Sequence, residues 1–70
     1  SEAIAEYEQA ILLDPDSTIA WFDLGVIHAS LNQESQAIRC YDQALLIHPD
    51  NAEARFNRAN ALRRLGNYLE

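Results

Sequence analysis

Apolar residues recur along the chain at the spacing of an α-helix, in four stretches that are separated by short polar segments. In the first stretch they follow one another at intervals of four, three and one, which places on one helical face Ala3, Tyr7, Ala10 and Ile11. The pattern predicts four helices, over residues 2–14, 18–31, 35–47 and 52–65. Because the connections are short, consecutive helices are expected to lie antiparallel.

Turn and capping residues mark the ends of these helices. Pro15 and Pro49 follow the first and third helices, which they cannot continue. Behind each proline stand residues whose side-chain oxygen can cap the next helix, namely Asp16 and Ser17, then Asp50 and Asn51. Asn32 and Gly66 are the residue types that best tolerate the left-handed conformation closing a helix. A fifth element is therefore expected to begin within residues 67–70.

The sequence repeats itself with a period of 34 residues. When residues 1–17 are laid over residues 35–51, nine of the seventeen aligned pairs are identical. These pairs include Ala3/Ala37, Tyr7/Tyr41, Ala10/Ala44 and Pro15/Pro49. Residues 18–36 agree less well with residues 52–70, but they keep Ala20/Ala54, Phe22/Phe56 and Leu31/Leu65. Each period contains two helices, so the chain is expected to be built from stacked helical hairpins.

Small and large side chains are distributed in a way that predicts close packing within each hairpin. Gly25 and its counterpart Ala59 lie on one helix of a hairpin, and alanines lie on the other. Small residues let helix axes approach closely, and aromatic side chains fill the spaces beside them. The stripe of the second helix that is expected to face the hairpin interior consists of Trp21, Leu24, Gly25, His28 and Leu31.

Composition narrows the class of protein. The chain is 49% hydrophobic and 23% charged, which is too apolar for a disordered tail and too polar for a membrane span. Cys40 is the only cysteine, so no internal disulfide can form. No basic-then-apolar stretch resembles a signal peptide, which favours a cytoplasmic location. The chain does not begin with Met, and we expect it to be an excerpt or a processed product.

Charge is divided unequally between the two halves. Residues 1–38 carry a formal charge of −7 and residues 39–70 a charge of +1, with no Lys anywhere. Such an acidic surface repels phosphate backbones, so general nucleic-acid binding is disfavoured. The arginines 55, 58, 63 and 64 are spread around their helix and do not form one basic face.

The motif WFDLGVIH at residues 21–28, followed by Ala37, Tyr41, Ala44 and Pro49, resembles the tetratricopeptide repeat. The resemblance covers the whole chain, which reads as a single domain over residues 1–70. Residues 1–17 resemble the second helix of a partial repeat, residues 18–51 a complete repeat, and residues 52–70 the first helix of a following repeat. Departures from the family pattern are His28, Arg55, Arg58 and Ala59. The implied fold is all-α, with four helices as antiparallel hairpins stacked in a right-handed superhelix.

The resemblance implies a non-catalytic adaptor that binds a partner peptide or helix in a concave groove. The first helix of each repeat would line this groove, with Ile19, Phe22, Asp23, Val26, Ala29 and Ser30 from one helix. The next would add Glu53, Phe56, Asn57, Asn60, Arg63 and Arg64. The spacing of both sets is compatible with one helical face. Two alternatives remain open: the phenylalanines pack against neighbouring helices, and the arginines are solvated surface.

The groove residues also indicate the chemistry of a partner. One subclass of the family captures the carboxylate of chaperone tails with Lys and Asn, but this chain has Phe22, Phe56 and Asp23 at those positions. Asp23 would repel a carboxylate, so that clamp is disfavoured. A peptide with an apolar anchor followed by an acidic group fits better, with Arg63 or Arg64 pairing to its carboxylate.

Catalytic and metal-binding chemistry has little support in the sequence. The soft metal ligands are His28, His48 and Cys40, and nothing places all three on one side. Cys40 has no His or Asp at a helpful helical offset to activate it as a nucleophile. We therefore expect no cofactor, no metal and no enzymatic activity.

Self-association is a second hypothesis. The first helix lacks a hairpin partner in the sequence, and the last lacks a successor. The last helix of one molecule would then pack on the first helix of the next and complete a repeat between them. Apolar residues that would otherwise face water are Ile4, Ile11, Leu62 and Leu65. Such a head-to-tail contact need not close, so it would produce chains of molecules.

Overall fold

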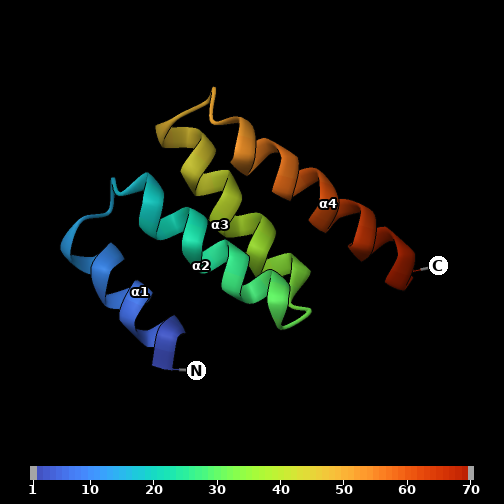
Figure 1. Ribbon diagram of the computed structural model, residues 1–70, viewed down its shortest axis with the longest axis horizontal. Helices are drawn as coiled ribbons and strands as arrows, with labels where there is room; N and C mark the ends of the chain where they lie inside the picture. The colour runs from blue at the N-terminus through green and yellow to red at the C-terminus, as the bar shows by residue number, and fades with distance from the viewer. Residues whose placement is uncertain (1, 70) are drawn as a thin grey trace.

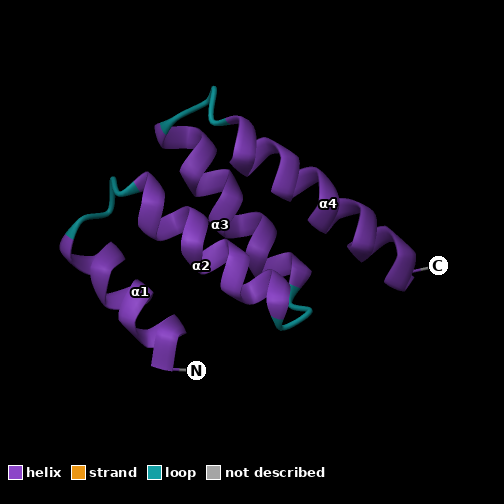
Figure 2. Ribbon diagram, viewed as in Figure 1, coloured by secondary structure: helices purple, strands orange, loops and turns teal. Residues whose placement is uncertain are grey.

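The computed structural model describes the backbone of residues 2–69 and the side chains of residues 2–66. Four helices follow one another in chain order: α1 (Glu2–Leu13), α2 (Thr18–Ser30), α3 (Glu34–Ile47) and α4 (Ala52–Leu69). They lie antiparallel to their neighbours and are joined by short loops (Figures 1 and 2). Helix α2 packs on α1 and α3, and α3 packs on α4. This arrangement of helical hairpins confirms the predicted all-α fold, and no helix among the described residues is long and apolar enough to cross a membrane.

Equivalent residues cap α2 and α4. The Ser17 hydroxyl accepts a hydrogen bond of 3.1 Å from the backbone N–H of Ala20. One period later, Oδ1 of Asn51 accepts a bond of the same length from the N–H of Ala54. Each cap satisfies one of the N–H groups that a helix start leaves unpaired. The predicted caps at Ser17 and Asn51 are therefore confirmed.

The two predicted helix-closing residues behave differently. Asn32 adopts a φ of 60°, so the left-handed closure of α2 is confirmed. Gly66 has no positive φ, and α4 continues through it to Leu69. The expected fifth element is therefore wrong for residues 67–69, and Glu70 lies outside the described residues. A glycine inside a helix costs only about 1 kcal/mol relative to alanine, and residues 67–69 contain no proline that would stop the helix.

The core lies between α2, α3 and α4. Its centre is a cluster of buried residues, Ala37, Tyr41 and Ala61. The ring of Tyr41 lies directly against Gly25, where an added Cβ would be only 2.6 Å from Cε1 of the tyrosine. Gly25 therefore admits the tyrosine ring between α2 and α3, as the distribution of small and large residues predicted.

The stripe expected to fill the hairpin interior is only partly buried. Leu24 and Gly25 are buried, but Trp21 and His28 are half-buried and Leu31 is 49% exposed. Trp21 lies at the start of α2, where its Nε1 donates a hydrogen bond of 2.9 Å to the carbonyl of Pro15. Trp21 and Leu31 were expected to be buried inside the hairpin, and both are more exposed than predicted. Both residues lie near the ends of α2, where fewer neighbouring side chains cover them.

Candidate functional site

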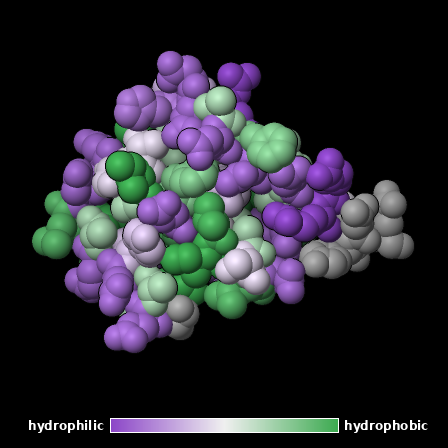
Figure 3. Space-filling view, viewed as in Figure 1, coloured by the Kyte–Doolittle hydropathy of each residue, from purple (hydrophilic) through white to green (hydrophobic). Residues whose placement is uncertain are grey.

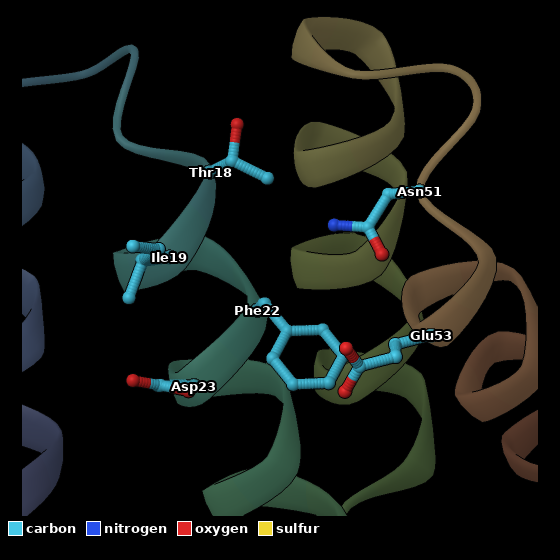
Figure 4. A pocket seen from close by; sticks show the side chains of 6 residues that line it. All are labelled: Thr18, Ile19, Phe22, Asp23, Asn51 and Glu53. Carbon is cyan, nitrogen blue, oxygen red and sulfur yellow. The ribbon is translucent and has the colours of Figure 1, made fainter.

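A hollow opens between the starts of α2 and α4 (Figure 4). It has a volume of about 170 Å³ and is lined by Thr18, Ile19, Phe22, Asp23, Asn51 and Glu53. Both helices pack on α3 and contact one another little. The ring of Phe22 forms the floor of the hollow, and the carboxylate of Glu53 points toward this ring, while Asp23 points away toward α1. Of the residues expected to line a groove, Ile19, Phe22, Asp23 and Glu53 line this hollow. We use the name α2–α4 groove for the whole expected surface, which consists of residues 19, 22, 26 and 29 of α2 and residues 53, 56, 60 and 63 of α4.

The α2 wall of this groove is apolar. Ile19 is 75% exposed and Val26 is 40% exposed, so neither side chain is used by the core. Phe22 is half-buried, and its ring lies 5.9 Å from that of Tyr41 at an angle of 46°. One alternative from the sequence was that Phe22 packs against neighbouring helices, and its contact with Tyr41 of α3 supports this alternative in part. Hydrophobic side chains gather over α2 in the middle of the face shown in Figure 3.

The α4 wall mixes one aromatic ring with polar groups. Phe56 is 67% exposed, so the alternative that this ring packs against neighbouring helices is not seen among the described residues. Asn57 and Asn60 are half-buried. Arg63 is exposed, and its Nη2 donates a hydrogen bond of 2.7 Å to Oδ1 of Asn60. This wall therefore presents an aromatic side chain and an oriented guanidinium on one helical face.

Arg64 is directed elsewhere. Its Nε lies 3.5 Å from Oε1 of Glu34, a carboxylate at the start of α3 with a side chain only 1% exposed. This oxygen has no hydrogen-bond partner among the described residues, so the nearby guanidinium is its main compensation. Of the two arginines predicted to face a partner, Arg63 is exposed and Arg64 is paired with Glu34. Nothing in the sequence marked Glu34 as buried, because a lone acid at a helix start is usually solvated.

Two tyrosines couple the helices beside the groove. The hydroxyl of Tyr7 donates a hydrogen bond of 3.2 Å to Oδ2 of Asp23. The negative charge of Asp23 and this hydrogen bond raise the pKa of Tyr7. Burial raises the pKa of Tyr41, an effect that the charge of Arg64 and a hydrogen bond from Asn57 oppose. Asp23 and Asn57 are thus engaged by tyrosines of the preceding helix.

The soft ligands are distributed over separate parts of the chain. Nδ1 of His28 donates a hydrogen bond of 2.7 Å to Oε1 of Gln33. Nδ1 of His48 and the hydroxyl of Thr18 share a hydrogen bond of 2.8 Å, which joins the end of α3 to the start of α2. Cys40 is buried, and this burial raises the pKa of its thiol to about 11. Each of these groups therefore has a structural partner or surroundings that account for it.

Comparison with known proteins gives one family. A family model described as TPR repeat matches residues 1–32 and residues 27–66, which together cover most of the chain. No curated protein matches the sequence.

Proposed function

This chain belongs to the tetratricopeptide repeat family, and we propose that it binds a partner peptide or helix in the α2–α4 groove. Repeats of this family generally mediate protein–protein interaction and are non-catalytic. The observation that carries the proposal is the exposure of large apolar side chains on this surface. Ile19, Val26 and Phe56 all face solvent there, although each has the size and hydrophobicity of a core residue.

Partner chemistry follows from the same surface. An apolar anchor would cover Ile19 and the ring of Phe56, and burying such side chains is the usual source of binding energy in a helix-lined groove. An acidic group beyond the anchor would pair with Arg63, whose guanidinium has, among the described residues, only its bond to Asn60 and several further donors.

A random peptide library displayed on phage tests the groove directly. We expect the chain to enrich apolar peptides, and the double variant Ile19→Ser with Phe56→Ser to lose this capture while circular dichroism stays helical. The matched control is Leu13→Ser with Leu46→Ser, because these leucines are exposed to a similar extent but lie outside the groove. Equal capture by all three proteins would contradict the groove assignment.

Self-association is the second candidate, and a division of charge between the terminal helices favours it. Helix α1 carries Glu2, Glu6 and Glu8 with no basic residue, whereas α4 carries four arginines and one acid within its bounds. No residue of α1 is buried, and Leu62 of α4 is 42% exposed. A second copy could therefore place its α1 against α4 with complementary charge.

Sedimentation equilibrium over a wide concentration range separates the two candidates. Mass that grows with concentration at low salt, and falls back toward 7.9 kDa in high salt, would support charge-assisted stacking. A monomer at every concentration would exclude it and leave the groove as the site of function.

A further inference from the structure

The α2–α4 groove carries opposite charges at its two ends, and both charges belong to the same wall. Glu53 lies in the first turn of α4 and Arg63 lies ten residues later on the same helical face. At a rise of 1.5 Å per residue, their Cα atoms are separated by about 15 Å along the helix. Between them the wall presents the neutral residues Phe56 and Asn60.

Glu53 is placed where it can bind a cation of a partner. Among the described residues its carboxylate has no ion pair, and it points toward the ring of Phe22 (Figure 4). A Lys or Arg side chain entering here would lay its aliphatic stem on the ring of Phe22 and place its charged end beside the carboxylate. The hollow at this point gives such a side chain room.

The other arginines of α4 do not add positive charge near the Glu53 end of the groove. Arg58 is bonded to Asp42 of α3 at 2.5 Å, and Arg64 is paired with Glu34. Arg55 lies about 200° around the helix from Glu53, since each residue turns the helix by about 100°. Arg63 is thus the cation that the groove offers, and Asn60 orients it.

We infer that the α2–α4 groove binds a partner segment in one direction, with a basic residue at Glu53, apolar side chains along α2, and an acidic residue at Arg63. The inference rests on the proposed function and adds to it the basic residue and the polarity. The two charged residues of the partner stand about 15 Å apart, which corresponds to about ten residues of a helix or four to five residues of an extended strand. The apolar side chains of α2 would contribute most of the binding energy, and the two charges of α4 would fix the orientation of the bound segment.

Single neutralisations test each end of the groove. We would select a random peptide library on the unaltered chain, on Glu53→Gln and on Arg63→Gln. The unaltered chain is expected to enrich peptides that contain a basic residue, apolar residues and an acidic residue. Glu53→Gln should lose only the enrichment of basic residues, and Arg63→Gln only that of acidic residues. Asp14→Asn and Arg39→Gln make the same charge changes at exposed positions outside the groove and should leave the selected peptides unchanged.

A synthetic peptide of the selected sequence then gives the size and direction of the effect. Each groove neutralisation should raise its Kd by roughly two- to fivefold, as expected for a solvent-exposed ion pair. A nitroxide on the basic end of the peptide should broaden the amide resonances near Glu53 more strongly than those near Arg63, and a nitroxide on the acidic end should reverse this order.

The outcomes distinguish failure of this inference from failure of the proposed function. Selected peptides that are apolar only, and bind both neutralised variants equally, would overturn the polarity and leave the groove standing. Peptides that still bind Ile19→Ser with Phe56→Ser, or a library in which nothing is enriched, would overturn both.

Discussion

The Tyr7 hydroxyl reaches across from α1 to Asp23 of α2, where it donates a hydrogen bond of 3.2 Å to Oδ2. The negative charge of Asp23 is the main cause that raises the pKa of Tyr7. Tyr41 stands one period later, and there burial is the main cause of a raised pKa, which Arg64 and Asn57 oppose. Tyrosines at equivalent positions of the repeat therefore meet different electrostatic surroundings.

The pair of Tyr7 and Asp23 predicts a shift in tyrosine titration. Because the folded-state pKa of Tyr7 lies above its usual value of 10.0, the contact with Asp23 is fully present below pH 10 and is lost as the pH rises through the folded-state pKa. Replacing Asp23→Asn removes the charge that is the main cause and should lower the pKa of Tyr7. NMR of the ring carbons, assigned residue by residue, measures this. An unchanged Tyr7 titration in Asp23→Asn would show that the contact does not form in solution.

The two glycines predict opposite effects of the same substitution. Gly25→Ala would place a Cβ 2.6 Å from the ring of Tyr41, and we expect it to destabilise the fold by about 1–3 kcal/mol. Gly66→Ala has nothing within 4 Å, and we expect a gain of up to about 1 kcal/mol from improved helix propensity. Urea denaturation of the two variants and the unaltered chain compares them. A stabilised Gly25→Ala would mean that α2 and α3 are less closely packed than described.

The buried acid predicts a coupling between α3 and α4. Removing the guanidinium in Arg64→Ala leaves the carboxylate of Glu34 buried and uncompensated. Since the Arg64 side chain is 48% exposed, we expect a loss of about 1–2 kcal/mol, below the figure for a fully buried pair.

A double-mutant cycle with Glu34→Gln measures this coupling through the free energies of unfolding. The loss in Arg64→Ala should be smaller when Glu34 is already neutral. Arg63→Ala serves as the control, because its side chain is exposed and bonded only to Asn60, and its effect should stay within about 0.5 kcal/mol. Strictly additive effects of the two changes would contradict an interaction between Glu34 and Arg64.

Cys40 predicts an unreactive thiol in the folded chain. Burial is the main cause that raises its pKa from 9.0 to about 11, and the charge of Glu8 adds to it. Because the fold favours the neutral thiol, its contribution to stability is complete below pH 9 and fades between pH 9 and pH 11. Iodoacetamide at pH 8 should alkylate the native chain many times more slowly than the chain in denaturant. Equal rates would show that Cys40 is accessible.

The fold followed from the sequence because its signals are local. The capping oxygens of Ser17 and Asn51 and the left-handed Asn32 act within a few residues of where they stand. The predicted end of the last helix at Gly66 was wrong, because a glycine permits the left-handed conformation that closes a helix but does not require it. Whether α4 stops there depends on the free energy of the whole helix.

The candidate site could be predicted from the sequence only in part. Helical spacing placed Phe22 and Glu53 on the helical faces that line the hollow between α2 and α4, whereas a shared groove with Phe56 and Arg63 stays a prediction. The same spacing could not separate Arg63 from its neighbour Arg64, because the difference arises from Glu34, thirty residues away in the sequence. An ion pair between residues so far apart in the sequence produces no pattern in the spacing of residues along either helix.

Ala59 stands where the preceding hairpin has Gly25, and this difference has a consequence for the packing of any further helix. Tyr41 reaches the backbone of α2 because no methyl group intervenes. A helix that packed on α4 as α3 packs on α2 would meet the methyl of Ala59 instead. Such a helix would need either a side chain smaller than tyrosine at this point or a wider separation of the two axes.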